Sequence, residues 1–270
     1  MNGLPVTHCP CCGSSERSRA FETWNELIYR RCLSCNSVYQ DPRNVPQYEE
    51  EYWGIVEDPD GKRRDLSEER EFKVKNWYGK TIQHVNGLDP GRILDIGAGL
   101  GYFLSAIDEK WIKHAVEISE YSSVKILENV DDIVLYKRIE EILETDYFDV
   151  VMFYHVIEHL ENPHETLEQI YRMLKPNGTL IIGTPNVNSI ASRVFGPNFR
   201  LYVPGHLFLL TPKSLTRILR PNRFSVFKKE YPYWNTDYRN FSNMIRMLTP
   251  WKLSPPFYGN IMTYYAHVIK

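Results

Sequence analysis

A glycine-rich turn directly after a short apolar segment is the feature that most constrains the fold of this chain. Residues 93–103 read ILDIGAGLGYF, and the apolar run predicts a buried parallel strand with Asp95 near its carboxyl end. Gly97, Gly99 and Gly101 allow backbone conformations closed to other residues and let a ligand approach the main chain. The next residues, YFLSAIDEK, predict the start of a helix. Because ligands bind at the carboxyl ends of strands in open α/β sheets, we expect a binding site at this turn.

The spacing of the glycines separates this turn from the common phosphate-binding loops. A dinucleotide fingerprint has glycine at its first, third and sixth positions, but the sixth position here is Tyr102. A P-loop needs GxxxxGK[ST], and the GKT at 79–81 lies in a helical pattern without a glycine five residues earlier. The pattern therefore indicates a ligand that has a nucleoside but no phosphate to neutralise.

A second apolar segment, WIKHAVEIS at 111–119, predicts the next strand and has Glu117 near its end. Glu117 lies 22 residues beyond Asp95, where an acidic side chain can accept hydrogen bonds from the hydroxyl groups of a ribose. A solvated strand end is the other interpretation of a single glutamate. Together with the glycine turn before it, Glu117 favours the ribose interpretation.

Four segments, in the right order, resemble class I S-adenosylmethionine-dependent methyltransferases. DIGAGLG and Glu117 resemble the first two motifs of that superfamily, while FDVVMFYHVIEHLENP (148–163) and LKPNGTLIIGTPN (174–186) resemble its fourth and fifth strands with the loops that follow. The resemblance covers roughly residues 70–270. It implies an α/β fold, namely a Rossmann-like seven-stranded sheet with helices on both faces, in which the closing IMTYYAHVIK lies antiparallel between the fifth and sixth strands. It also implies S-adenosylmethionine as the methyl donor.

The same resemblance assigns the cofactor contacts. Asp95 and the backbone of 97–101 would face the methionine moiety, Glu117 the ribose, and Ile118 one face of the adenine. The third motif, IVLYKRIEE, offers Arg138 and Ile139 where the family often has an acid or a small polar residue. The full set of expected cofactor residues is Asp95, Gly97, Ala98, Gly99, Gly101, Tyr102, Phe103, Glu117, Ile118, Arg138, Ile139, Tyr154 and His155.

The segment HVIEH places His155, Glu158 and His159 at positions i, i+3 and i+4, so a helical turn after the fourth strand would point them to one side. GHLFLLTP adds His206, and we expect these four residues to border the acceptor pocket as the catalytic group. In small-RNA 2′-O-methyltransferases and some ubiquinone-pathway O-methyltransferases, a similar ExxEH segment binds a divalent metal. Two interpretations stay open: a site for zinc, iron or manganese, or a hydrogen-bonded loop with His206 as a general base or packing residue.

All five cysteines lie between positions 9 and 35, in the pattern of two C-x2-C pairs separated by 19 residues. This spacing is typical of a tetrahedral zinc site, and the predicted ligands are Cys9, Cys12, Cys32 and Cys35. Gly13 and Asn36 follow the two pairs and tolerate the tight backbone that each turn needs. Cys11 is then the spare thiol. Disulfides are the alternative, although nothing in the sequence places the chain in an oxidising compartment.

The cysteines define an N-terminal zinc ribbon that is too small to fold without its metal. Its five basic and four acidic residues nearly balance, which gives little support for nucleic-acid binding. A structural or substrate-gating role is favoured, and methyltransferases with this arrangement are similar to enzymes that act on sugars or secondary metabolites. The residues expected to form β-hairpin strands over a minimal core are Phe21, Trp24, Ile28, Tyr29, Val38 and Tyr39.

The chain divides into a zinc ribbon (1–45), a linker (46–64) and a methyltransferase domain (65–270) with capping insertions near 186–206 and 232–259. The linker region predicts a short helix, and its Tyr48, Tyr52 and Trp53 form either a lid or a packed connection. Apolar spacing in 66–85 predicts one covering helix, and proline-initiated helices are expected at 163–178 and 211–222.

The second insertion is dense in aromatic residues, methionine and proline. We expect a capping helix there, whereas a segment lying on a membrane surface is the alternative. The residues expected to be buried in that helix are Phe241, Met244, Ile245 and Leu248.

Composition indicates which partners and which cellular location the sequence favours. A net charge of −2 favours neither nucleic acid nor anionic lipid as a partner, and the absence of an apolar run of 18 residues or a signal-like start favours a cytoplasmic protein. The expected function is methyl transfer to a small-molecule acceptor, for example a sugar or secondary metabolite. The alternatives are a non-catalytic nucleoside-binding module, an enzyme that uses the sulfonium differently, and an RNA- or protein-directed methyltransferase. The sequence leaves open whether oxygen, nitrogen or carbon is methylated.

Overall fold

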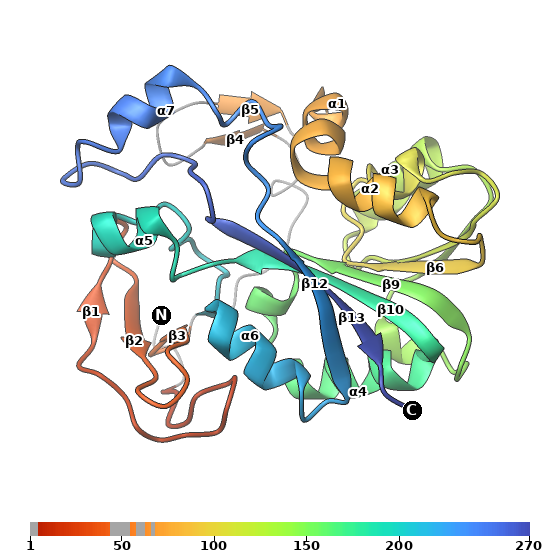
Figure 1. Cartoon of the computed structure of the whole chain (residues 1–270), viewed down its shortest axis with the longest axis horizontal. Coiled ribbons are helices and arrows are strands. Elements are labelled where there is room, and N and C mark those ends of the chain that lie inside the picture. The colour runs from red at the N-terminus through yellow and green to blue at the C-terminus, as the bar shows by residue number, and fades with distance from the viewer. Residues whose placement is uncertain (1–4, 44–54, 58–62, 66–67) are drawn as a thin grey trace.

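A seven-stranded sheet forms the centre of the computed structural model, which describes residues 5–43, 55–57, 63–65 and 68–270 (Figure 1). The strand order is β12-β13-β10-β9-β6-β7-β8, and β13 is antiparallel to both of its neighbours. This order confirms the expected methyltransferase-type sheet with its closing strand between the fifth and sixth. The strands are β6 Arg92–Ile96, β7 Ile112–Val116, β8 Ile133–Tyr136, β9 Phe148–Tyr154, β10 Leu174–Pro185, β12 Phe224–Glu230 and β13 Ile261–Val268.

Helices cover both faces of this sheet, with α1, α2 and α3 on one side and α4 and α6 on the other in Figure 1. The expected covering helix before β6 is one helical run that contains a wider, π-helical turn, Val74–Tyr78. Proline occupies the first turn of both α4 and α6, as the sequence predicts. The helices are α1 Arg70–Lys73, α2 Gly79–Asn86, α3 Glu120–Asn129, α4 Pro163–Met173, α5 Ile190–Phe195, α6 Pro212–Leu219 and α7 Phe241–Arg246.

Alternation along the strands divides the core into two layers. Leu94 of β6 packs in one cluster with Leu167 of α4 and Ile218 of α6. Its neighbour Ile93 belongs to the opposite cluster, together with Val85 of α2. Because both faces are buried, the carboxyl ends of the central strands are the places where polar side chains can meet a ligand.

The prediction of a helix after the glycine turn is wrong, because the chain forms only a short 3₁₀ helix, Leu104–Ala106, before it turns again. Tyr102, Phe103 and Leu104 are all buried. Three consecutive buried side chains do not fit the single apolar face of an amphipathic helix, so the segment folds as successive turns.

The ribbon forms β1 Phe21–Glu22, β2 Ile28–Arg31 and β3 Val38–Gln40, which confirms the expected hairpin strands. Trp24 lies outside these strands and is partly exposed. The ribbon sheet has the order β1-β2-β3-β11, and its fourth strand, β11 Phe208–Leu209, comes from the catalytic part of the chain.

The described part of the linker contributes an antiparallel pair, β4 Ile55–Glu57 and β5 Arg63–Asp65. The linker aromatics Tyr48, Tyr52 and Trp53 lie outside the described residues, and the short helix expected in the linker is not found in its described part, residues 55–57 and 63–65.

The expected burial of the second insertion is wrong. Phe241 and Leu248 are 76% and 74% exposed, and Met244 and Ile245 are also exposed. The helix α7 is held instead by polar contacts, because buried Asn243 donates from its side-chain amide to Tyr238 O and from its backbone to Asn240 Oδ1. In the part of the chain that the structure describes, no helix combines the length and apolar character needed to cross a membrane.

We predict that Gly183→Ala destabilises the fold by about 1 to 3 kcal/mol, because an added methyl forces the sheet apart at one position. A Cβ on Gly183 of β10 would lie 2.2 Å from ring carbons of Tyr154 on β9. Urea unfolding measures the change, with Gly79→Ala as the matched control because its Cβ would meet only an ordinary contact at 3.5 Å. Equal stability of Gly183→Ala and the parent protein would contradict this packing.

Candidate active site and zinc centre

The glycine turn joins β6 to the carboxyl end of β7 through backbone hydrogen bonds. Gly97 N and Ala98 N donate to Val116 O, and φ is +72°, +57° and +75° at Gly97, Gly99 and Gly101. These values lie in the left-handed region that favours glycine. At Gly97 a side chain would also collide with Val156, since a Cβ would lie 2.5 Å from its Cγ2. Backbone conformation therefore favours glycine at all three positions, and at Gly97 the closeness of the loop after β9 requires it as well.

Two buried carboxyl groups lie at this turn. Glu117 accepts hydrogen bonds from Gly99 N (2.8 Å) and Ser119 N (2.9 Å), which fix the orientation of its side chain. Burial raises the pKa of Glu117, and burial together with the charge of Glu117 raises the pKa of Asp95. Both shifts express the cost of an anion in a low-dielectric site, and a cationic ligand with hydroxyl groups would lower that cost.

The other expected cofactor residues divide by exposure. Tyr102, Phe103 and Tyr154 are buried in the wall of the core, and Ala98 is nearly so, whereas Ile118 is 62% exposed and can offer its face to a ring. Arg138 is largely exposed and pairs with Glu140 at 3.3 Å. The role of Arg138 at an adenine remains a prediction from the sequence.

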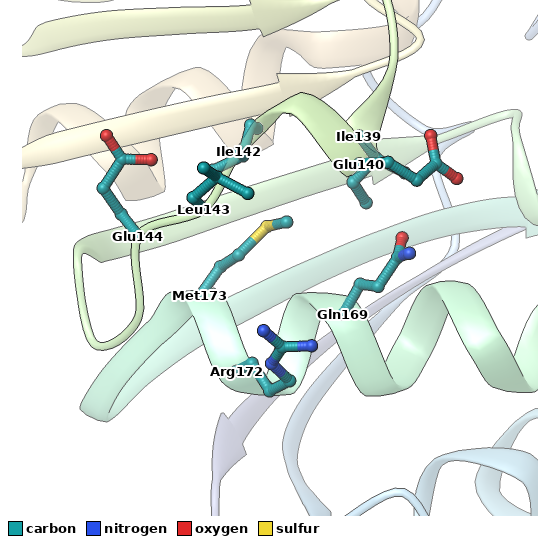
Figure 2. A pocket seen from close by; sticks show the side chains of 8 residues that line it. All are labelled: Ile139, Glu140, Ile142, Leu143, Glu144, Gln169, Arg172 and Met173. Atoms are coloured by element: carbon teal, nitrogen blue, oxygen red, sulfur yellow. The ribbon is translucent and has the colours of Figure 1, made fainter.

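A pocket between the β8–β9 connection and α4 lies apart from this turn (Figure 2). Of the expected cofactor residues it contains only Ile139, and Figure 2 shows its other walls, among them Glu144, Gln169 and Met173. We therefore do not assign this pocket to the cofactor.

His155 and Glu158 form a hydrogen-bonded pair directly after β9. His155 Nδ1 lies 3.0 Å from Glu158 Oε1, and Thr184 Oγ1 donates to the other carboxylate oxygen at 2.9 Å. Burial alone would raise the pKa of Glu158, but the hydrogen bond from His155 and the electrostatic interaction with the nearby histidines lower it to about 2. Glu158 is therefore an anion that can only accept, so Nδ1 of His155 carries the donated hydrogen and Nε2 is the ring nitrogen left for proton exchange.

His159 and His206 approach the same carboxylate. His159 Nδ1 donates to Gly205 O (2.9 Å) and His206 Nδ1 donates to Leu201 O (2.7 Å), and the two rings meet edge to face at 4.9 Å. One ligand-type atom from each of Glu158, His159 and His206 lies within 4.8 Å of the others. Burial lowers the pKa of His159 and lowers that of His206 to about 3, so both rings are neutral.

The structure thus brings the four predicted catalytic residues together, but their local backbone conformation differs from the helical turn that we expected from the sequence. The segment forms a 3₁₀ turn, Ile157–His159, and His155 lies outside it with φ +55°. A non-glycine residue in this region is uncommon and costs free energy, which is a feature of functional sites.

Two neighbours of this cluster were not identified from the sequence. Trp77, assigned there to an apolar helix face, lies beside His155 with ring centroids 5.3 Å apart. The π-helical turn that places it leaves Trp77 O free to accept a hydrogen bond from Tyr154 Oη (3.3 Å). Thr184 could have been found, since a polar residue near the carboxyl end of a buried strand is a candidate site residue.

The zinc centre has the geometry that the cysteine spacing predicts. The Sγ atoms of Cys9, Cys12, Cys32 and Cys35 lie within 4.8 Å of one another, and the closest pairs, Cys9–Cys35 and Cys12–Cys32, are 3.6 Å apart. A tetrahedral ion with Zn–S bonds of about 2.3 Å needs Sγ atoms roughly 3.8 Å apart, so the four thiols fit zinc. All five cysteines are free thiols rather than disulfides.

The backbone turns at the two cysteine pairs also have the conformation that we expected from the sequence. Gly13 and Asn36 have φ of +69° and +65°, and each donates its backbone N–H to the first cysteine of its pair at 2.9 Å. Cys11 is buried and donates to Ser214 O at 3.4 Å, which agrees with its expected place outside the ligand set.

The sheet order, the glycine turn and the acid after the next strand define a nucleoside-binding α/β enzyme. A family model described as "Methyltransferase domain" matches residues 75–228, more than half of the chain, and the chain belongs to this methyltransferase family. It is an enzyme of the S-adenosylmethionine-dependent class, as the sequence resemblance implies.

Curated relatives match over part of their length. Ubiquinone biosynthesis O-methyltransferase of Bradyrhizobium diazoefficiens is 28% identical over 162 residues, which are 55% of this chain and 64% of that protein. The tRNA U34 carboxymethyltransferase of Syntrophotalea carbinolica is 28% identical over 172 residues, 60% of this chain and 48% of that protein. The chain therefore spans less than two thirds of the length of these relatives.

Solved structures agree with the fold. A SAM dependent methyltransferase from Archaeoglobus fulgidus has 25% identity and a TM-score of 0.53, covering 74% of this chain and 97% of that chain. A SAM dependent methyltransferase from Aquifex aeolicus has 17% identity and a TM-score of 0.52, covering 73% and 93%. The second likeness concerns the fold alone.

We expect one zinc ion per chain. Cys32→Ser removes a thiolate from the tetrahedral set and should abolish stoichiometric zinc, whereas Cys11→Ser should retain it because Cys11 lies outside the set. Elemental analysis of protein purified without chelator measures both. Zinc-free parent protein, or full occupancy in Cys32→Ser, would contradict the four-thiolate site.

S-adenosylmethionine and S-adenosylhomocysteine should bind in the micromolar range. Gly99→Val and Glu117→Ala should weaken S-adenosylhomocysteine binding by at least about tenfold, or roughly 1.4 kcal/mol, since the first strains a positive φ and the second removes the ribose acceptor. Glu120→Ala is the control, because this exposed acid on α3 pairs with Lys137 and not with the turn. Tight NAD binding in calorimetry, with none for S-adenosylhomocysteine, would overturn the assignment.

Proposed function

We propose that the protein transfers a methyl group from S-adenosylmethionine to a hydroxyl group of a small molecule, with His155 as the general base and Glu158 as its orienting partner. The observation that carries this proposal is the His155–Glu158 pair at the carboxyl end of β9, beside the glycine turn. A hydroxyl is a weak nucleophile until its proton is removed, and a neutral imidazole held by a carboxylate is suited to that task.

The cofactor residues carried over from the sequence support the donor side. Asp95 and the backbone of 97–101 would hold the methionine moiety, and the oriented carboxylate of Glu117 would accept from the ribose. S-adenosylmethionine supplies an electrophilic methyl carbon, and transfer forms a carbon–oxygen bond while the carbon–sulfur bond breaks. The protein contributes position and a proton acceptor, because in-line alignment removes most of the entropic barrier.

On the acceptor side, His155 Nε2 takes the hydroxyl proton while Nδ1 keeps its hydrogen bond to Glu158. The resulting imidazolium is stabilised by the buried carboxylate, which stays ionised. His159 and His206 hold their rings through backbone carbonyls and line the same cluster as neutral groups. Trp77 borders His155 and limits access to it.

The relatives support a hydroxyl acceptor, because several are named as ubiquinone biosynthesis O-methyltransferases. None of the relatives described above is named for a sugar or a secondary metabolite, so the proposal keeps the small-molecule hydroxyl and not those classes. The tRNA carboxymethyltransferase relative makes RNA the rival acceptor. Assaying small-molecule and RNA fractions separately decides between them.

A divalent ion is the second arrangement that the site geometry favours, because Glu158, His159 and His206 offer three ligand atoms within 4.8 Å. Backbone carbonyls fix both histidine tautomers, as is usual for metal-binding imidazoles. Elemental analysis distinguishes the two arrangements. A second metal equivalent that is lost in His206→Ala supports the ion, and zinc at one equivalent in both proteins supports the hydrogen-bonded cluster.

His155→Ala should lower methyl transfer by about 10²- to 10⁴-fold, because the general base is lost. Binding of S-adenosylhomocysteine should weaken much less than turnover, since His155 is only one of the expected cofactor residues. The measurement is transfer of tritiated methyl from S-adenosylmethionine to a small-molecule extract fraction. Glu161→Gln is the control, as this exposed acid on the same loop pairs with Arg43 and not with His155.

Glu158→Gln should reduce turnover in the same assay, because an amide holds the imidazolium less well than a carboxylate. His159→Ala and His206→Ala test the rest of the cluster. Full turnover on the true acceptor in both of these variants would show that neither residue has a catalytic role. Full turnover in His155→Ala would refute the proposed base.

A further inference from the structure

The ribbon sheet does not end within the ribbon. Its strand β3 pairs with β11, with Tyr39 opposite Phe208 and Val38 opposite Leu209. The pairing extends by one more hydrogen bond, from Gln40 N to Leu207 O at 2.9 Å. The segment that follows His206 is therefore an edge strand of the zinc ribbon.

This segment is held from its other side by the catalytic loop. Leu207 N donates to Glu158 O at 2.8 Å, so one residue is bonded both to the ribbon and to the turn that carries Glu158. Tyr29 adds a second link, because its buried hydroxyl donates to His206 O at 2.8 Å. Gln40 Nε2 donates in turn to that hydroxyl at 3.3 Å.

Two of the cysteines predicted to bind zinc lie between the two strands that make these contacts. Cys32 directly follows β2, which carries Tyr29, and Cys35 lies shortly before β3, which carries Gln40. The second C-x2-C turn thus connects β2 to β3, and an ion bound there fixes the separation of the two strands.

The ribbon is also anchored to the catalytic domain on the side of the cysteine turns. Cys11 Sγ donates to Ser214 O (3.4 Å), Arg217 Nη1 donates to Ser34 O (3.0 Å), and His164 Nε2 donates to Cys11 O (3.2 Å). Both cysteine turns therefore rest against α6 and the start of α4. With this end fixed, the position of the hairpin determines the position of His206.

We propose that the zinc ribbon is a positioning element of the acceptor half of the active site, in which the Tyr29 hydroxyl sets the place of His206 and of the Glu158 turn. This inference rests on the proposed function, since it gives the acceptor role to the cluster around Glu158. Tyr29 is a positioning residue and touches neither substrate nor cofactor.

A change in the ribbon should affect the acceptor side of the site and not the cofactor side. The Tyr29 hydroxyl and Gln40 N bond to the carbonyls of His206 and Leu207, whereas the 97–101 turn and Glu117 are hydrogen-bonded to each other and to Val116 and Ser119. Disturbing the ribbon should therefore reduce turnover and leave binding of S-adenosylhomocysteine unchanged. A ribbon that only stabilised the fold would affect both in proportion.

The test compares Tyr29→Phe with Tyr39→Phe. Each variant removes one hydroxyl from an equally buried tyrosine of the ribbon sheet, but the Tyr39 hydroxyl makes no hydrogen bond to His206. Amide hydrogen exchange at Leu207 measures directly how firmly its N–H is bonded to Glu158 O. The Gly99 amide, which donates to Glu117, is the internal reference. We expect about tenfold faster exchange at Leu207 in Tyr29→Phe, with Gly99 unchanged.

Turnover is measured with the acceptor-containing small-molecule fraction and expressed per site that binds S-adenosylhomocysteine, so that unfolded protein does not count. Tyr29→Phe should lose about tenfold in kcat, with the dissociation constant of S-adenosylhomocysteine within about twofold of the parent, and Tyr39→Phe should lose neither. Unchanged turnover per site and unchanged Leu207 exchange in Tyr29→Phe would overturn the inference, as would equal effects in the two variants.

The same measurements separate this inference from the proposed function. If His155→Ala and His206→Ala retain full turnover, the proposed catalytic cluster is wrong whatever Tyr29→Phe does. If those variants are impaired while Tyr29→Phe is not, the cluster stands and the positioning role of the ribbon is rejected.

Discussion

The buried carboxylate of Glu158 is the interaction on which the rest of the site depends. An ionised carboxyl group removed from water is costly unless hydrogen bonds and opposite charge replace the solvent. Here one oxygen accepts from His155 and the other from Thr184, and the pKa of the acid is raised by burial less than it is lowered by the hydrogen bond from His155 and the nearby histidines. The partners come from the end of β9 and the end of β10, so the site exists only when these two strands pair in register.

The same requirement explains the unusual backbone at His155. The ring can reach Glu158 only if the chain turns sharply out of β9, and His155 adopts φ +55° to make that turn. His155 N donates to Gly183 O at 2.8 Å, which continues the β9–β10 pairing up to the turn itself. Gly183 has no side chain, and this allows the Tyr154 ring to pack directly over it. Local strain at His155 is thus balanced by sheet pairing and by a close packed contact one residue earlier.

The sequence could predict those parts of the fold that local chemistry determines. Glycine spacing, the acid at Glu117 and the two C-x2-C pairs each have a short-range physical cause, and the resemblance supplied the strand order. It could not predict the turn after Gly101, because burial of Tyr102 and Phe103 depends on helices distant in the chain. Nor could it predict that Phe241 and Leu248 are exposed, since an apolar pattern on a six-residue helix does not state which side faces the protein. The grouping of His206 with Glu158 was expected from the resemblance, but one of the hydrogen bonds that hold His206 comes from Tyr29 of the ribbon, 177 residues earlier in the chain.

Packing joins the ribbon to the rest of the chain in addition to hydrogen bonding. Cys9, Cys32 and Cys35 belong to the same hydrophobic cluster as Phe208 and Leu210 and the inner face of α6. The ribbon therefore shares a core with the catalytic sheet and has none of its own to fold around. Since a structural zinc ion binds only the folded arrangement of its thiolates, its binding free energy stabilises every element that packs in that cluster. A zinc ion bound there would be linked to the Glu158 turn through β11, whereas the backbone of the glycine turn is held by hydrogen bonds of its own to the end of β7.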